Sequence, residues 1–131
     1  MTDSTLLYAS VSHLRQLLKD RAVSSEELTQ ACLKQIDETN EALNAVITVC
    51  PEQALESARA ADSALAKGES KSLTGIPLLH KDIFCTRGVR TTCGSRMLGQ
   101  FVPAYDATVV SKMKAGGVVM NGKCYMDELA M

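Results

Sequence analysis

The chain lacks an excess of charge of either sign. Its 131 residues contain 14 lysines and arginines against 15 aspartates and glutamates, which gives a formal net charge of −1. Proteins that bind nucleic acids usually carry a concentrated basic surface, and no basic stripe appears along this sequence. We therefore do not expect this chain by itself to bind DNA or RNA.

Long apolar runs are also missing. The longest fall far short of the roughly 20 residues of a transmembrane helix, and the opening residues MTDSTLLYAS lack the basic and apolar segments of a secretory signal. With 46% apolar residues the chain can still bury a core. These features predict one globular, cytoplasmic domain.

The cysteines offer neither a disulfide framework nor a zinc motif. There are five of them at wide spacing, and no two form a CxxC pair, so we expect reduced thiols. Cys85 or Cys93 would need a base to act as a nucleophile, and His13 and His80 are the only histidines. His80 lies inside an apolar run, which favours a packed, hydrogen-bonded histidine over a catalytic one.

Motifs for phosphate binding and paired carboxylates are absent too. Neither GxxxxGK[ST] nor GxGxxG occurs, so Gly94-Ser95 and Gly116-Gly117 are expected to form turns or caps. Asp127 and Glu128 are adjacent and should lie on different faces, and Asp106 is expected to cap a helix. We expect no metal or other cofactor to be bound by this chain.

The first 40 residues predict a pair of short helices. Leucines at helical spacing form a first helix that should end near residues 20–22. Ser24 and Glu27 form a capping box for a second helix, which should end near Asn40. We interpret this part as a helical cap over a larger core, with a docking surface for another subunit as the alternative.

The remainder alternates strands with helices. Residues 43–50 are β-branched and predict a buried strand. The next helix should begin at Pro51 and stop at Gly68, and a strand over residues 75–84 follows it. Strand, helix and strand in this order predict an α/β layer.

A second unit of the same kind follows. A helix with Val109, Val110 and Met113 on its apolar side should end at Gly116-Gly117 and lead into a strand over residues 118–123. The final YMDELAM begins a helix or a loop, and no glycine, proline or polar tail follows it. We therefore expect the chain to be part of a longer polypeptide.

Lys81 is the best candidate for chemistry. The apolar run delivers Lys81 and Asp82 to its end, just before a stretch rich in Gly, Thr and Ser. Burial in a dry pocket lowers the pKa of a lysine from roughly 10.4, because desolvation penalises the ammonium. A buried Lys81 would accept a proton from a serine near neutral pH. An exposed strand terminus is the alternative.

Two runs carry a family resemblance: LTGIPLLHKDIFCTRGVRTTCGS over residues 73–95 and YDATVVSKMKAGGVVMNGKCYMDELAM over residues 105–131. They resemble the N-terminal part of the amidase signature family, most closely its glutamyl-tRNA(Gln) and aspartyl-tRNA(Asn) amidotransferase A subunits. The resemblance implies an α/β fold that is part of an α/β/α sandwich around a mixed sheet. Residues 1–131 would belong to one amidase domain, with 1–40 as the helical cap and 41–131 as the strand–helix–strand layer.

The resemblance also implies a Ser–cis-Ser–Lys amidase with Lys81 as the general base. Both family serines lie downstream of a motif that here reads MDELAM and ends at Met131. Neither Ser95 nor Ser111 sits in such a motif, so no catalytic serine is assigned and the 131 residues alone are expected to be inactive. Met131 is assigned to substrate binding.

In such an enzyme, the A subunit hydrolyses glutamine and passes ammonia to the B subunit, which amidates charged tRNA. A small C subunit packs against the A subunit in a heterotrimer, and ATP and Mg²⁺ are used by the complex rather than by this chain. Two alternatives stay open. One is another amidase-signature hydrolase of small amides, and the other is a non-catalytic module whose N-terminal helices bind a partner resembling the C subunit.

Overall fold

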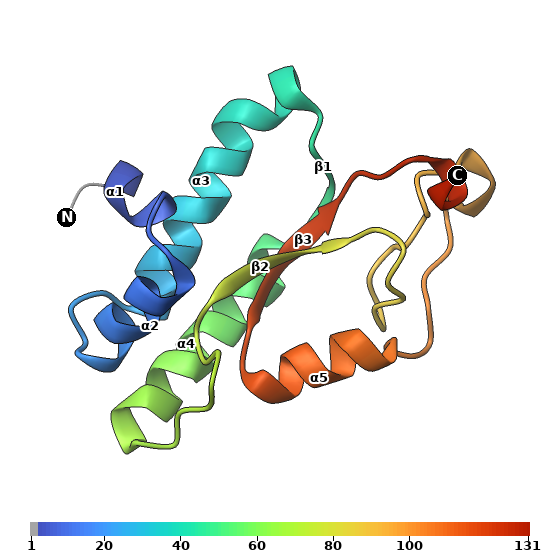
Figure 1. The fold of residues 1–131 in the computed structure, drawn as a ribbon. Helices are drawn as coiled ribbons and strands as arrows, with labels where there is room; N and C mark the ends of the chain where they lie inside the picture. Colours follow the sequence, from blue (N-terminus) through green and yellow to red (C-terminus); the bar gives the residue numbers. More distant parts are fainter. Residues whose placement is uncertain (1–2) are drawn as a thin grey trace.

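The chain folds into a small mixed sheet with helices packed against it (Figure 1). The computed structural model describes residues 3–131, so residues 1–2 of the predicted helical cap lie outside the described residues. None of the helices in the described part is long and apolar enough to cross a membrane. The elements are α1 (Asp3–Leu7), α2 (Val11–Lys19), α3 (Ser25–Leu43), β1 (Val46–Val49), α4 (Pro51–Lys67), β2 (Pro77–Lys81), the 3₁₀ turn η1 (Arg96–Leu98), α5 (Thr108–Gly116), β3 (Val119–Cys124) and the 3₁₀ turn η2 (Glu128–Ala130).

Both predicted N-terminal helices are present, and local hydrogen bonds set where they begin. The hydroxyl of Ser10 accepts from the backbone N–H of His13 and starts α2. The predicted capping box starts α3: the Ser24 hydroxyl accepts from the Glu27 N–H at 3.0 Å, and the Glu27 carboxylate accepts from the Ser24 N–H at 2.8 Å. The sequence pattern does not predict α1, which precedes them.

Helix α3 is longer than predicted and passes the expected boundary of the cap after Asn40. It ends at Leu43, and Asn44 follows in the left-handed conformation with φ 49°. Asn40 lies inside the helix, and its side-chain amide accepts from the N–H of Val46 and donates to the carbonyl of the same residue. Asn40 therefore shapes the turn between α3 and β1.

The three strands lie in the order β1-β3-β2. β3 is antiparallel to β1 and parallel to β2, which confirms the mixed sheet that the family resemblance implies. α5 supplies the crossover between the parallel strands β2 and β3. Each predicted strand is present, although β1 and β2 are shorter than expected and β3 is displaced by one residue.

Helix α4 contacts the sheet through small side chains. It begins at Pro51 and is followed by Gly68 at φ 75°, both as predicted. Ala54 and Ala58 are fully buried and pack with Val119 of β3. Because alanine carries only a methyl group, the helix axis can lie close to the strand and hold β3 at the centre of the layer.

A second apolar cluster joins the N-terminal helices to the start of β2. Its side chains come from all three of the first helices, from the turn between α2 and α3, and from the residue just before β2. Its buried members are Leu6, Leu14, Leu18, Val23, Leu28 and Ile76. The helices of the first 40 residues thus pack on a core within this chain, and their interpretation as a cap stays a prediction.

The start of α5 corrects one prediction. Ala107 is the N-cap residue, and no side chain caps the helix there. The carboxylate of Asp106 instead accepts from the Arg87 N–H at 2.7 Å and forms an ion pair with Lys114 at 2.7 Å. The prediction of Asp106 as a helix cap is wrong, because these two partners fix it as a brace between α5 and the loop after β2.

The apolar face of α5 is narrower than predicted. Val110 is fully buried, but Val109 is 39% exposed rather than on the packed side. The helix ends where expected, at Gly116, and Gly117 follows with φ 91°.

Candidate active site at the ends of β2 and β3

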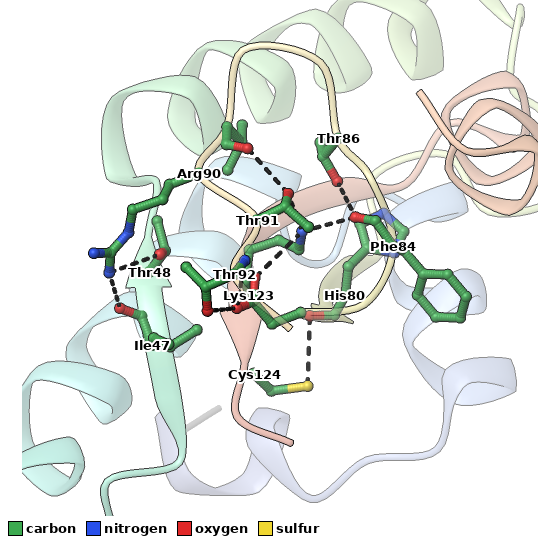
Figure 2. A network of polar contacts seen from close by, with 12 residues as sticks. Ile47, Thr48, His80, Phe84, Thr86, Arg90, Thr91, Thr92, Lys123 and Cys124 are labelled. Atoms are coloured by element: carbon green, nitrogen blue, oxygen red, sulfur yellow. Dashed lines mark hydrogen bonds and ion pairs between the residues drawn. The ribbon is translucent and has the colours of Figure 1, made fainter. Parts of the chain in front are cut away.

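Lys81, Asp82 and Lys123 lie at or next to the ends of the parallel strands β2 and β3. The register places His80 opposite Lys123 and Lys81 opposite Cys124. In α/β proteins, ligands bind at the carboxyl ends of parallel strands. This edge, together with the loop that follows β2, is the candidate site (Figure 2).

Lys81, the predicted base, ends β2 with an exposed side chain. Its amine forms no hydrogen bond or ion pair with residues 3–131. Its backbone is fixed, because its carbonyl accepts from the N–H of Phe84 at 3.0 Å. The expected burial of Lys81 is not found, since the residue is exposed in the described chain. Its role as a base stays a prediction.

Asp82, the residue after β2, lies in the interior, whereas Lys81 is exposed. The side chain of Asp82 is fully buried. One carboxylate oxygen accepts from both the N–H, at 3.0 Å, and the hydroxyl of Thr92. The other lies 3.6 Å from the amine of Lys123, an ion pair longer than a direct hydrogen bond. The charge of Asp82 is therefore balanced inside the protein.

Lys123 is a site residue that the sequence analysis missed. It is fully buried, and its amine donates to the Phe84 carbonyl at 2.8 Å and to the Thr91 hydroxyl at 2.9 Å (Figure 2). Burial lowers the pKa of Lys123, while the neighbouring Asp82 acts in the opposite direction. A signal was present: two predicted strands each carry a lysine near the carboxyl end, and a parallel pairing brings such ends together.

A strained turn connects Asp82 to the MDELAM segment. Cys93 and Gly94 are both left-handed, with φ 52° and 67°. The Cys93 N–H donates to the Asp82 carbonyl at 3.1 Å, and the Cys93 carbonyl accepts from the Leu129 N–H at 2.8 Å. A Cβ atom at Gly94 would lie 2.7 Å from the Met126 carbonyl oxygen, so the close approach needs glycine.

Neither serine named in the sequence analysis is paired with Lys81. The buried Ser95 donates its hydroxyl hydrogen to the Glu128 carboxylate at 2.8 Å and accepts from the Met97 N–H at 3.3 Å. Ser111 is exposed on α5. Met131 is 96% exposed, and its predicted role in substrate binding stays a prediction.

The surroundings of Cys93 make it a poor nucleophile. All five cysteines are free of disulfides, as expected. Burial raises the pKa of Cys93, and the nearby carboxylate of Asp82 raises it further, which disfavours the reactive thiolate. The thiol of Cys124 donates to the His80 carbonyl at 3.5 Å.

His80 is packed as predicted but lacks the expected hydrogen bond at one nitrogen. Its ring meets the edge of Phe84, with ring centroids 6.5 Å apart, and only 5% of the residue is exposed. Nε2 is buried and has no hydrogen-bond partner among the residues that the structure describes. Burial lowers the pKa of His80, and the positive charge of Lys123 lowers it further.

We expect His80 to make the chain less stable at acid pH. Because its pKa in the folded state lies below the unfolded value of about 6.5, the unfolded chain takes up the proton first. The contribution of His80 is present above that pH and is lost as the pH falls towards the folded pKa. His80→Gln should therefore reduce the drop in melting temperature between pH 7.5 and pH 5, whereas His13→Gln, on an exposed position of α2, should not. An identical drop in both variants would contradict this.

Comparison with known proteins relates the whole arrangement to amidases. A family model described as Amidase matches residues 27–131. The chain is 57% identical over 124 residues to the A subunit of the glutamyl-tRNA(Gln) amidotransferase of Nitrosococcus oceani, and 51% identical over 131 residues to the protein of the same name from Dehalococcoides mccartyi. These alignments cover 95% and 100% of this chain but 26% of each relative. The chain thus spans about a quarter of the length of these curated relatives.

Solved structures show the same fold. The native peptide amidase of Stenotrophomonas maltophilia superposes with a TM-score of 0.87 at 33% identity, over 92% of this chain and 25% of that one. An amidase family protein from Bacillus anthracis gives a TM-score of 0.88 at 32% identity, over 96% and 26%. The mixed α/β arrangement found here is therefore the one present in these crystallised enzymes.

Proposed function

This chain belongs to the amidase family, and from that membership we propose that it forms the part of a glutamine-hydrolysing A subunit that supplies the catalytic lysine. Its similarity to the two amidotransferase subunits supports the glutamine-dependent branch. The observation that carries the proposal is the end of β2, where the Lys81 amine has no partner among the described residues while the carboxylate of Asp82 is bound in the interior.

The separation of the Asp82 carboxylate from the Lys81 amine matters for base catalysis. A carboxylate beside an amine favours the ammonium form, which has no lone pair with which to accept a proton. Thr92 and Lys123 hold the carboxylate of Asp82 away from the amine of Lys81. Lys81 is thereby left free to lose its proton once a pocket closes over it.

In the proposed reaction, Lys81 receives a proton through a relay serine while a second serine attacks the side-chain amide of glutamine. The proton then passes to the leaving nitrogen, ammonia departs, and water releases glutamate from the acylated serine. Both serines would come from the remaining three quarters of a chain as long as the relatives, since no serine of the described residues is paired with Lys81.

The same proposal assigns the ammonia to a partner, the B subunit, where it would amidate ATP-activated Glu-tRNA(Gln). A small third protein, the C subunit, would pack against the A subunit of this cytoplasmic heterotrimer. ATP, Mg²⁺ and tRNA would be bound by the complex, which suits the near-neutral charge of this chain and its lack of a phosphate loop.

A second candidate is a hydrolase of small amides that works without tRNA. The similarity to the peptide amidase, at 33% identity, is the observation in its favour. The higher identity to the amidotransferase subunits favours the first candidate.

A hybrid subunit distinguishes the two. In it, this chain replaces the matching N-terminal quarter of the Nitrosococcus oceani A subunit, and the hybrid is co-purified with the B and C subunits of that organism. We expect glutamine hydrolysis together with glutamine-dependent amidation of Glu-tRNA(Gln). Hydrolysis of small amides without amidation would support the second candidate. A folded hybrid with neither activity would contradict both.

A further inference from the structure

We propose that Lys123 and Asp82 form a positioning pair for the proposed base, with Lys123 held as the ammonium so that Lys81 alone can take up a proton. The proposal rests on the function proposed for Lys81. Both members of the pair have fully buried side chains, and they come from different parts of the chain, one from β3 and one from the residue after β2.

The groups that form hydrogen bonds with the Lys123 amine all act as acceptors. Its amine donates to the carbonyl of Phe84 and to the hydroxyl of Thr91. That hydroxyl gives its own hydrogen to the carbonyl of Val89 at 3.1 Å, so it can only accept from the lysine. The third direction faces the carboxylate of Asp82. Loss of the proton would leave a buried carboxylate without a counter-charge, which is strongly unfavourable.

The pair also fixes the turn that begins at Lys81. That turn is closed by the hydrogen bond from the Phe84 N–H to the Lys81 carbonyl at 3.0 Å, and the Phe84 carbonyl is held in turn by Lys123. Asp82 is tied through its backbone as well, since its N–H donates to the Cys124 carbonyl at 3.1 Å. The residue after Lys81 and the end of the turn are therefore both anchored to β3.

Removing Lys123 should change the charge seen by Lys81. The carboxylate of Asp82 would lose its counter-ion, and Lys81 is the adjacent residue whose amine has no partner within residues 3–131. Attraction between the two would favour the ammonium form of Lys81 and reduce the fraction present as the neutral amine that can accept a proton. The titratable groups that surround the pair and share its field are His80, Cys50, Cys85 and Cys93.

The test uses the hybrid subunit in its complex and the pH profile of kcat/KM for glutamine. Lys123→Met removes the charge and keeps a side chain of similar length. We expect kcat to fall by about 100-fold, the cost of misplacing a catalytic group by about 1 Å. The acid limb should move to higher pH, because a base with a raised pKa needs a higher pH to lose its proton. Lys112→Met, at an exposed position of α5, is the matched control and should leave kcat and the acid limb of the pH profile unchanged.

A double variant separates positioning from folding. Lys123→Met with Asp82→Asn removes both charges. The acid limb of the pH profile should therefore return to its position in the unsubstituted hybrid, and kcat should rise about tenfold or more above that of Lys123→Met alone. A merely structural pair would lower the melting temperature while the folded fraction keeps the original pH profile and kcat/KM, and that result would overturn the proposal. An unsubstituted hybrid without activity would instead count against the proposed function.

A measurement on the unsubstituted 131-residue chain keeps the proposal testable if the variants fail to fold. Nitrogen-15 NMR of the lysine amines at pH 7.5 should show Lys123 as an ammonium whose hydrogens exchange slowly, because it is buried and hydrogen-bonded. A neutral amine at this position would overturn the assignment of Lys123 as the residue that keeps its proton.

Discussion

Replacing Lys81 by alanine in the hybrid subunit should lower kcat for glutamine hydrolysis by about 10²–10⁴-fold, the range for loss of a general base. The fold should be retained, because the Lys81 side chain is exposed and makes no hydrogen bond or ion pair with the described residues. Steady-state glutaminase assays at saturating glutamine, together with melting temperatures, measure both effects.

Lys81→Arg decides whether the amine acts as a base or only as a positive charge. An arginine keeps the charge but does not lose its proton in proteins, so a base requirement makes this variant as inactive as the alanine variant. Lys112→Ala, at an exposed position of α5, should keep full activity. An active Lys81→Arg enzyme would show that the residue binds substrate charge and accepts no proton.

Gly122→Ala should have the largest effect on stability. Gly122 lies in the central strand, paired with Val49 of β1 on one side and with Leu79 of β2 on the other. A Cβ atom there would overlap the carbonyl oxygen of Thr48 and lie 3.2 Å from the Cα of Val49. These are backbone atoms that cannot rotate away, so β1 would have to separate from β3. We expect the free energy of unfolding of the 131-residue chain to fall by at least about 3 kcal/mol, the upper end of the usual cost of overpacking.

Gly116→Ala is the matched control for this substitution. Gly116 is the last residue of α5, and the nearest atom to an added Cβ would be 3.7 Å away, an ordinary contact. Its unfolding free energy in urea should stay within about 0.5 kcal/mol of the parent. Equal losses in the two variants would mean that the close approach of β1 to Gly122 does not determine stability.

Local features of the fold were predictable because they depend on neighbours in the sequence. The capping box at Ser24 and the left-handed stop at Gly68 each involve groups within one helical turn, and both predictions are confirmed. Asp106 failed for the complementary reason: its partners are the Arg87 backbone, distant in sequence, and a lysine two turns along α5. A carboxylate before a helix is a good cap only when no stronger partner competes for it.

For the site, the sequence predicted the strand end that carries Lys81 but not its environment. Lys81 and Asp82 stand at the end of β2, as the apolar run indicated. Lys123 was missed because its burial arises from the parallel pairing of β2 with β3. The sequence of a single strand does not show which other strand it pairs with. The exposure of Lys81 was likewise decided by which segments pack over the strand end.

By itself, the sequence determined helices α2 to α5, the three strands, the family motifs and the lysine–aspartate pair at a strand end, because periodicity, capping and turn chemistry act over a few residues. The tertiary structure alone decided that β3 lies between β1 and β2, that Asp82 pairs with Lys123 in the interior, and that the Lys81 amine has no hydrogen-bond or ion-pair partner within residues 3–131. These facts depend on contacts between residues about forty to eighty positions apart, which no local pattern in the sequence encodes.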